Sequence, residues 1–387
     1  MAVEARTPDG LWPRVSRDHA SGPYHPPPRL IASLPTAVFQ CAMFRRIRER
    51  MSSDNHTPRL NWARGAPHRR IVGGTLLFLI AAVALTVGIT LVHDQPSAAA
   101  PVYVPTDRAV KLKLLDQMGK PPQLLIFGGS RATRFEPSYL QTKTGLRGFN
   151  LALQNGRPED AWAFLNVAHE LHPNTPLHIV WFVHVEAFRE QGLSAGVVQE
   201  PRLARWFPES MLDAARAKLP RTAAEAPKGN DLKLATFGPD GVVLHNRYDI
   251  ALARGRTLKR ALAWSTDKAL QRYATTTPAL DPRSMEYFEK TLALAQRLGI
   301  EPVIVFMPLH PRLLAAVSEA GWEERHTEVM AYLDGLQDHY RFTTLDFSDL
   351  SSVHGDPSAY YDGFHVKRSL ARRVIDATVA AAPATFR

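Results

Sequence analysis

Three side chains in this sequence have the types and the placement needed for nucleophilic acyl transfer. Ser130 follows paired glycines at the end of the apolar run QLLIF, residues 123–127, and paired glycines allow the sharp bend by which a strand enters a turn. Asp362 and His365 stand three residues apart, directly before a helical stretch. A short turn can hold the carboxylate against one imidazole nitrogen, so that the other nitrogen accepts the proton of a serine hydroxyl. We therefore expect Ser130 as nucleophile, His365 as base and Asp362 as its partner.

Each half of this pattern also occurs without any function. Gly-Gly-Ser is an ordinary loop sequence, and an isolated Asp-x-x-His is most often a surface feature. The joint placement favours chemistry, because both pieces follow strands of a predicted parallel sheet. The carboxyl ends of such strands meet at one edge of the sheet, where open α/β folds bind their ligands.

Alternating strands and helices are predicted to position these residues. Strands are expected over the apolar run that ends at Gly128, and over residues 147–153, 177–183, 303–307 and 343–347. Helices are expected over residues 107–118, 158–173 and 285–300, and from about Val366. This alternation predicts an α/β fold with a parallel, doubly wound sheet. Residues 190–284 interrupt the alternation and are interpreted as an insertion that forms a lid.

Residues 71–92 form a run of 22 residues without a charge, which at about 1.5 Å per residue can cross a hydrocarbon core of about 30 Å. Arg64, Arg69 and Arg70 precede the run, so the positive-inside rule predicts a cytoplasmic N-terminus. A buried core helix and a signal peptide cleaved near residues 97–100 are the alternatives. The length of the run and the 70 residues before it favour a single-pass anchor in the cell membrane, with everything after it extracytoplasmic.

The distribution of charge argues against a nucleic-acid-binding protein. The formal net charge is +10, and +7 of it lies in residues 1–70, next to the predicted span. Those residues also contain nine prolines and are expected to be a disordered basic tail. Residues 93–115 are predicted to be a tether and residues 116–387 the catalytic domain.

Composition and motifs indicate chemistry that needs no cofactor. The single cysteine, Cys41, excludes an intramolecular disulfide and a cysteine-rich zinc site. The sequence contains no glycine-rich phosphate loop, dinucleotide fingerprint or metal-ligand spacing. We therefore expect neither a cofactor nor a metal.

The Gly-Gly-Ser turn after the first strand and Asp-Gly-Phe-His, residues 362–365, before the last helix resemble the SGNH (GDSL-like) hydrolase superfamily. The resemblance covers about residues 116–386 and implies a three-layer α/β/α sandwich of an esterase or acyltransferase. It matches Ser130 to the family's nucleophile, His365 to the base and Asp362 to its partner. Within the superfamily the chain looks most like membrane-anchored envelope members related to DltD and the alginate O-acetylation proteins.

The resemblance weakens at the residues that stabilise the oxyanion. The family's second block reads Asn-x-Gly-x-Ser-Gly, whereas here Asn150 is followed five residues later by Asn155, with Gly156 displaced by one. The third block has an Asn at the end of its strand, but this chain has FVHVE, residues 182–186. The loss of one oxyanion donor slows such reactions by about two to three orders of magnitude.

The resemblance implies that the backbone N–H groups of Ser130 and Gly156, or the Asn155 side chain, supply the oxyanion donors, beside Gly129 and Asn150. Arg131 is a candidate for binding an anionic acceptor or for pairing with a local carboxylate. His310 and His184 follow predicted strands and are weaker candidates for the same edge.

These features predict a membrane-anchored, extracytoplasmic serine esterase or O-acyltransferase that acts on envelope glycan or acyl groups. Whether the acyl group passes to water or to a sugar hydroxyl is left open. The expected partners are the membrane, an envelope polysaccharide or acyl donor, and a membrane-bound acyltransferase. The alternative is a non-catalytic envelope subunit of the same fold that binds glycan or a partner enzyme, and the missing third-block Asn favours it.

Overall fold

The computed structural model describes residues 106–189, 192–220, 235–275 and 280–387. The predicted tail, the predicted span at 71–92 and most of the predicted tether lie outside the described residues. Among the helices of the described part, none is long and apolar enough to cross a bilayer.

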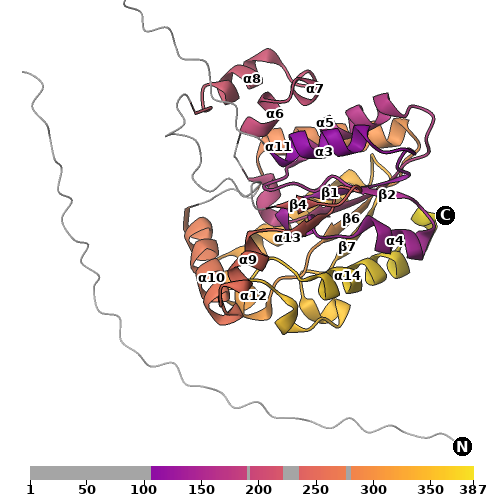
Figure 1. The fold of residues 1–387 in the computed structure, drawn as a ribbon. Coiled ribbons are helices and arrows are strands. Elements are labelled where there is room, and N and C mark those ends of the chain that lie inside the picture. The colour runs from indigo at the N-terminus through magenta and orange to yellow at the C-terminus, as the bar shows by residue number, and fades with distance from the viewer. Residues whose placement is uncertain (1–105, 190–191, 221–234, 276–279) are drawn as a thin grey trace, which may run out of the picture. The chain divides into compact units, whose positions relative to one another are not determined.

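A five-stranded parallel sheet forms the centre of the fold, with strand order β2-β1-β3-β6-β7 (Figure 1). Its strands are β1 (Leu124–Gly128), β2 (Gly148–Asn150), β3 (His178–Val183), β6 (Val303–Phe306) and β7 (Thr343–Asp346). The chain runs from β1 outward to β2 and then crosses back to β3, so the winding direction reverses between β1 and β3. In doubly wound sheets this reversal opens the crevice where ligands bind. The predicted α/β class and parallel sheet are confirmed.

Both faces of the sheet are buried, which explains why the strands read as unbroken apolar runs. Leu125 and Phe127 of β1 belong to the core on one face, while Leu124 and Ile126 belong to the core on the other. Side chains alternate between the faces of a strand, so a sheet covered on both sides needs apolar residues at every position.

Helices cover the two faces as separate layers (Figure 1). One layer contains α3 (Asp107–Asp116), α5 (Pro158–Leu171), α11 (Pro282–Arg297) and α13 (Trp322–Leu336). The other contains α4 (Pro137–Thr144) and α14 (Arg368–Ala381). The arrangement agrees with a three-layer sandwich. The predicted helices correspond to α3, α5, α11 and α14, whereas α4, α13 and α12 (Pro311–Ser318) were not predicted.

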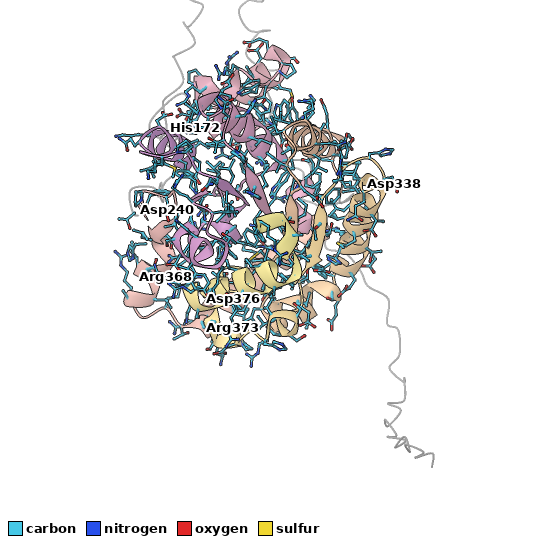
Figure 2. The ribbon with its side chains drawn as sticks, turned by 90° about the vertical axis from the view of Figure 1, so that its right-hand side faces the viewer. His172, Asp240, Asp338, Arg368, Arg373 and Asp376 are labelled. Atoms are coloured by element: carbon cyan, nitrogen blue, oxygen red, sulfur yellow. The ribbon has the colours of Figure 1, made fainter. Side chains whose placement is uncertain are left out.

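The last helix turns a charged face away from the sheet, as Figure 2 shows for Arg368, Arg373 and Asp376. Glu136, next to α4, accepts from Nε of Arg368 at 3.0 Å and from Nε of Arg372 at 2.7 Å. These half-exposed ion pairs tie α14 to α4 at the surface, where such pairs contribute little to stability.

The predicted insertion, residues 190–284, contains helices and a hairpin, and η2 (Val185–Phe188) directly precedes it. Its described elements are α6 (Ala195–Val198), α7 (Pro201–Ala204), α8 (Glu209–Arg216), β4 (Thr236–Phe237), β5 (Val243–His245), α9 (Arg247–Ala253) and α10 (Leu258–Thr275), a helix of 18 residues. The β4–β5 turn covers the edge strand β2, because the Asn150 N–H donates to the Asp240 carbonyl at 2.8 Å. A Cβ on Gly241 would lie 2.4 Å from the Asn150 carbonyl oxygen. Only glycine permits this close approach, which places α9 beside the carboxyl edge of the sheet.

The remaining short helices of the described part are η1 (Ser130–Ala132), η4 (Leu350–Val353), η5 (Pro357–Ala359) and η6 (Pro383–Phe386).

Candidate active site

Ser130 is placed by a tightly packed turn at the end of β1. Gly128 has a φ of +149°, and a Cβ there would lie 2.7 Å from the Phe182 carbonyl oxygen of β3. A Cβ on Gly156 would lie 2.2 Å from the Gly128 carbonyl oxygen. Glycine is therefore required at both positions, and the close packing directs η1 with Ser130 toward the carboxyl edge of the sheet.

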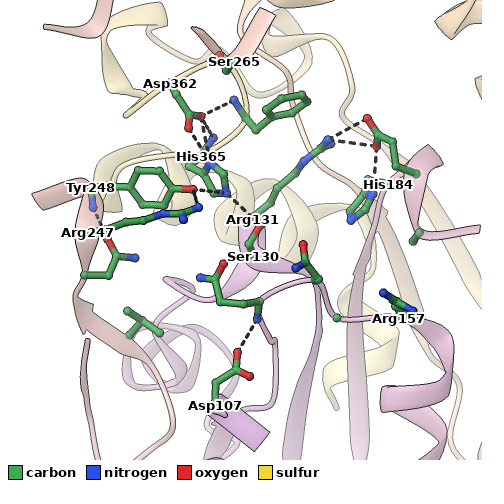
Figure 3. A pocket seen from close by; sticks show the side chains of 18 of the residues that line it. Asp107, Ser130, Arg131, Arg157, His184, Arg247, Tyr248, Ser265, Asp362 and His365 are labelled. Atoms are coloured by element: carbon green, nitrogen blue, oxygen red, sulfur yellow. Dashed lines mark hydrogen bonds and ion pairs between the residues drawn. The ribbon is translucent and has the colours of Figure 1, made fainter. Parts of the chain in front are cut away.

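The structure brings Ser130, His365 and Asp362 together (Figure 3). Ser130 Oγ lies 3.0 Å from Nε2 of His365, and Nδ1 of His365 lies 2.9 Å and 3.0 Å from the two carboxylate oxygens of Asp362. Burial alone would raise the pKa of Asp362, but the His365 ring and the N–H groups of Phe364 and His365 outweigh it and hold the pKa below its ordinary value. An ionised Asp362 accepts the Nδ1–H, which leaves the Nε2 lone pair for a hydroxyl.

Two neighbouring elements hold the turn that carries Asp362 and His365. The Gly363 N–H donates to Ser265 Oγ of α10 at 2.9 Å, and the Gly363 carbonyl accepts from the His310 N–H at 3.1 Å. A Cβ on Gly363 would lie 2.7 Å from the Leu313 side chain of α12. The insertion and the start of α12 thus fix the imidazole.

His310 itself does not line the cavity at Ser130. Its Nδ1 accepts the Arg312 N–H at 3.2 Å and caps the start of α12. Burial, with a smaller contribution from Arg312, lowers the pKa of His310, so the ring is neutral at pH 7 and can act as this acceptor. His310 therefore helps to hold the turn that carries Asp362 and His365, and it does not line the cavity.

Sequence reasoning missed Tyr248, which comes from α9 in the insertion. Its hydroxyl lies 2.9 Å from Nε2 of His365, the same nitrogen that faces Ser130. Asn246 and Asp249 form a capping box at the start of α9. The sequence signal Asn-x-x-Asp could have predicted that helix start, but no local pattern connects residue 248 with residue 365.

Asn150 is committed to the scaffold and does not line the cavity. Its side-chain amide donates to the carbonyls of Ala132 at 3.0 Å and Phe135 at 2.8 Å. Its side-chain oxygen accepts from the Ala152 N–H at 2.9 Å and from the buried Lys111 ammonium at 3.0 Å. With its hydrogen bonds all used, Asn150 ties β2 to the segment after Ser130 and has no donor left for an oxyanion.

The remaining candidate donors for an oxyanion belong to Ser130, Asn155 and Gly156, which line one cavity. The Ser130 N–H has no backbone acceptor among the described residues. Asn155 is exposed, lines the cavity, and its side chain has no hydrogen-bond partner within the described part of the chain. The Gly156 N–H already donates to the Leu153 carbonyl at 3.1 Å. Ser130 and Asn155 are therefore better placed than Gly156 to donate to a developing negative charge.

His184 occupies the end of β3, where the resemblance would place an Asn. Its Nδ1 lies 3.1 Å from Glu186 Oε2, and a Cβ on Gly129 would lie 2.9 Å from its Nε2. Burial, followed by the nearby Arg131, lowers the pKa of His184. A neutral ring that donates Nδ1–H to a carboxylate has only a lone pair on Nε2, so His184 does not replace the missing Asn as a donor.

Arg131 pairs with a carboxylate, one of its two predicted roles. Its guanidinium lies 3.2 Å from Glu186 Oε2 and 4.5 Å from the centre of the Phe364 ring. Tyr273 OH also donates to Glu186, at 3.0 Å. Burial would raise the pKa of Glu186, but Arg131 and His184 outweigh it and hold the pKa well below its usual range.

A cavity of about 420 Å³ lies beside Ser130 and His365. Of the predicted site residues, Ser130, Arg131, Asn155, Gly156, Asp362 and His365 line it, whereas Gly129, Asn150 and His310 do not. The insertion contributes much of the wall, including Tyr248 and Trp264. Such a volume is typical of small-molecule sites, which occupy about 300–1,000 Å³.

Comparison with known proteins adds little to this geometry. No protein-family profile matches the chain, and no curated protein matches it. A crystal structure of a Bacteroides fragilis protein, described as a presumed acylhydrolase, shares 10% identity over 72% of this chain and 95% of that chain, with a TM-score of 0.33. A similarity this low carries no argument, so the function has to be inferred from the site itself.

Proposed function

We propose that this protein is a serine esterase or O-acyltransferase in which Ser130, His365 and Asp362 act as a catalytic triad. The observation that supports it most is the continuous chain of contacts from Ser130 Oγ through His365 to Asp362, with distances of 3.0 Å and 2.9 Å. Hydrogen-bond contact between nucleophile, base and orienting carboxylate is the arrangement by which such sites are recognised.

In the proposed reaction Ser130 Oγ attacks the carbonyl carbon of an acyl ester while Nε2 of His365 takes its proton. The tetrahedral intermediate collapses when His365 returns the proton to the departing alkoxide, which leaves an acyl group on Ser130. Water or a sugar hydroxyl, deprotonated by His365, then attacks the acyl-enzyme and releases Ser130. The ionised Asp362 stabilises the imidazolium that forms in each half-reaction.

The donors available for the oxyanion are the Ser130 N–H and the Asn155 side chain. Sites of this kind gain most of their rate from donors aimed at the developing charge. With an Asn absent from the end of β3, we expect slow turnover relative to a site with a complete set of donors.

We further propose that the reaction takes place outside the cytoplasmic membrane, on envelope glycan or acyl groups. The support for this is the uncharged run at 71–92, the arginines before it and the resemblance to membrane-anchored envelope members of the SGNH superfamily. A membrane-bound acyltransferase that delivers the acyl group is the expected partner.

Labelling with a serine-reactive fluorophosphonate tests the nucleophile. The full chain, purified in detergent, should be labelled, and Ser130→Ala should abolish the label. Ser138→Ala, an exposed serine outside the cavity, is the matched control and should be labelled like the natural protein. Label that persists in Ser130→Ala would refute the assignment.

Hydrolysis of an activated acetyl ester tests the other two roles. His365→Ala should be nearly as inactive as Ser130→Ala, and Asp362→Asn should lose about a thousandfold or more because it favours the wrong tautomer of His365. The double variant Ser130→Ala with His365→Ala should be little worse than either single one, because triad members act as a unit. Additive losses would contradict the proposed mechanism.

A non-catalytic glycan-binding subunit is the second candidate, and two observations favour it. Tyr248 OH contacts the same His365 nitrogen as Ser130, at 2.9 Å, and the Gly156 N–H is already used within its turn. If the natural protein shows neither label nor turnover but binds envelope glycan, this second candidate is supported instead.

A further inference from the structure

The cavity beside Ser130 carries an excess of positive charge. Seven arginine and lysine side chains line it, together with three carboxylates. All three carboxylates are already engaged by the chain. Asp107 accepts the Gln154 N–H, Glu186 pairs with Arg131, and Asp362 holds His365.

Two of the cations that line this cavity, Arg157 and Arg189, each have a donor without an acceptor. The Nε atom of each is buried without a hydrogen-bond partner, and neither guanidinium forms an ion pair with a carboxylate of the described residues. Arg157 does donate through Nη1 to the Gly192 carbonyl. Buried donors without acceptors are unfavourable and rare in folded proteins, so this part of the cavity suits a ligand with acceptor oxygens.

The surroundings of these two arginines also disfavour their own charges. Burial lowers the pKa of Arg157 and outweighs the opposing effect of Asp160 and Glu159, and Arg108 and Arg189 add to the lowering. Burial and the neighbouring Arg272 lower the pKa of Arg189. Of the two acids that act on Arg157, Asp160 is paired with Arg108, and burial raises the pKa of Glu159 to about 7, so Glu159 is only partly ionised at neutral pH. An anion bound here would relieve the repulsion between the cations.

We propose that Arg157 and Arg189 bind an anionic group, a carboxylate or a phosphate, of the compound that reacts at Ser130. The planar guanidinium presents parallel N–H donors that match either group. Trp264 lines the same cavity, is 51% exposed and carries Arg256 over its ring, 5.4 Å from the centroid. Its remaining apolar surface suits the apolar face of a sugar ring. The substrate class is therefore an acylated or acyl-accepting sugar that bears a negative charge.

The assignment to the reacting compound rests on the proposed function, whereas anion binding itself does not. Binding is therefore measured first, on full-length Ser130→Ala protein in detergent, with inorganic phosphate, glucuronate and uncharged glucose as probes in isothermal titration calorimetry. Phosphate, glucuronate or both should bind, and glucose should bind at least about tenfold more weakly. The anion that binds more tightly shows whether the anionic group of the ligand is a phosphate or a carboxylate.

Variants then locate the anion site. Arg189→Gln should weaken anion binding about tenfold or more. Arg157→Lys keeps the positive charge but loses the planar guanidinium. It should therefore weaken anion binding less than Arg189→Gln does. Arg297→Gln, an exposed arginine at the end of α11 outside the cavity, is the matched control and should bind like the parent. Each variant is first checked for an unchanged thermal unfolding midpoint without ligand, so that a folding defect is recognised.

Turnover of acetylated glucose and acetylated glucuronate by the natural protein gives the second measurement. We expect kcat/KM to favour the anionic ester about tenfold or more, and Arg189→Gln to remove that preference mainly through KM. Anion binding that survives in both arginine variants, or glucose binding equal to that of the anions, would overturn the inference. Intact anion binding with no turnover of any ester would leave the anion site standing and refute the proposed enzyme.

Discussion

At the scale of single residues, the central feature is that two hydroxyl groups face one imidazole nitrogen. Ser130 Oγ and Tyr248 OH lie 3.0 Å and 2.9 Å from Nε2 of His365. The nitrogen has one lone pair, so it accepts a hydrogen from only one of them at a time. Arg247 Nη2 donates to the Tyr248 oxygen at 3.1 Å, which directs the tyrosine's own hydrogen toward Nε2. Tyr248 therefore competes with the proposed nucleophile for its base.

Replacing Tyr248 by phenylalanine should raise the reactivity of Ser130. The change removes the competing hydroxyl but keeps the ring that packs 4.4 Å from the His365 ring, centre to centre. A hydrogen bond worth about 0.5–1.5 kcal/mol corresponds to a two- to tenfold increase in the rate of fluorophosphonate labelling. Tyr361→Phe, which removes a hydroxyl bound to Asp249 instead, is the control and should react at the natural rate. Slower labelling of Tyr248→Phe would mean that this hydroxyl assists the reaction.

Glu159 on α5 should make stability depend on pH. Burial, and to a lesser extent Asp160, raises its pKa from 4.5 to about 7. A raised carboxyl pKa gives stability that is fully present below about pH 4.5 and is lost as the pH rises through about 7. The unfolding midpoint of Glu159→Gln should therefore match that of the natural protein near pH 4.5 and exceed it by several degrees at pH 8. The exposed Glu286→Gln serves as the control, and a constant difference between Glu159→Gln and the natural protein at all pH values would contradict the assignment.

The sequence could predict the residues that a local pattern marks, but not those whose role depends on distant partners. Ser130 follows β1 and the Asp362–His365 turn precedes α14, and the structure brings them together. Asn150 was expected near the oxyanion, yet its amide is used by the carbonyls of Ala132 and Phe135. Tyr248 reaches His365 from 117 positions away along the chain, which no local pattern encodes.

At the scale of elements, the buried strands and the helices α5 and α11 were predictable because burial leaves a strong pattern, whereas the 15-residue helix α13 was not predicted. A parallel strand covered on both faces is an apolar run, and α5 and α11 show apolar residues at helical spacing. The insertion could be predicted from the sequence only as a break in the alternation of strands and helices. Its four-residue helices α6 and α7 are too short to show a period, and isolated helices of that length are not stable without tertiary packing.

The contact between β1 and the Gly156 turn should be sensitive to a single methyl group. In Gly156→Ala the new Cβ would lie 2.2 Å from the Gly128 carbonyl oxygen, and backbone on both sides must move. We expect a loss of about 1–3 kcal/mol in stability and reduced labelling of Ser130, since η1 shifts with Gly128. Gly335→Ala, at an exposed position in α13 with no atom within 4 Å of the new Cβ, should instead stabilise the protein by up to about 1 kcal/mol. Chemical denaturation of both variants measures the contrast, and equal effects would show that the turn is loose.

At the scale of the whole molecule, the site lies where the winding of the sheet reverses. Ser130 follows β1 and His184 follows β3, the two strands on either side of the reversal. His365 arrives from the far end of the chain, and the insertion between β3 and α11 closes the remaining side of the cavity. This strand order results from tertiary packing, which explains why sequence could indicate a shared edge but not which elements would form the walls.

The predicted membrane topology lies outside the described residues and remains a prediction that a reporter can test. The arginines at 64, 69 and 70 precede the uncharged run at 71–92, so the N-terminus should stay in the cytoplasm and the C-terminus should be translocated. Alkaline phosphatase, which is active only outside the cytoplasm, should be active in bacterial cells when joined after Arg387. Replacing the three arginines by alanine should lower that activity, whereas replacing Arg6, Arg14 and Arg17, far from the span, should not. An inactive phosphatase fusion together with an active cytoplasmic reporter at the same position would show that the orientation is reversed and would exclude an extracytoplasmic substrate.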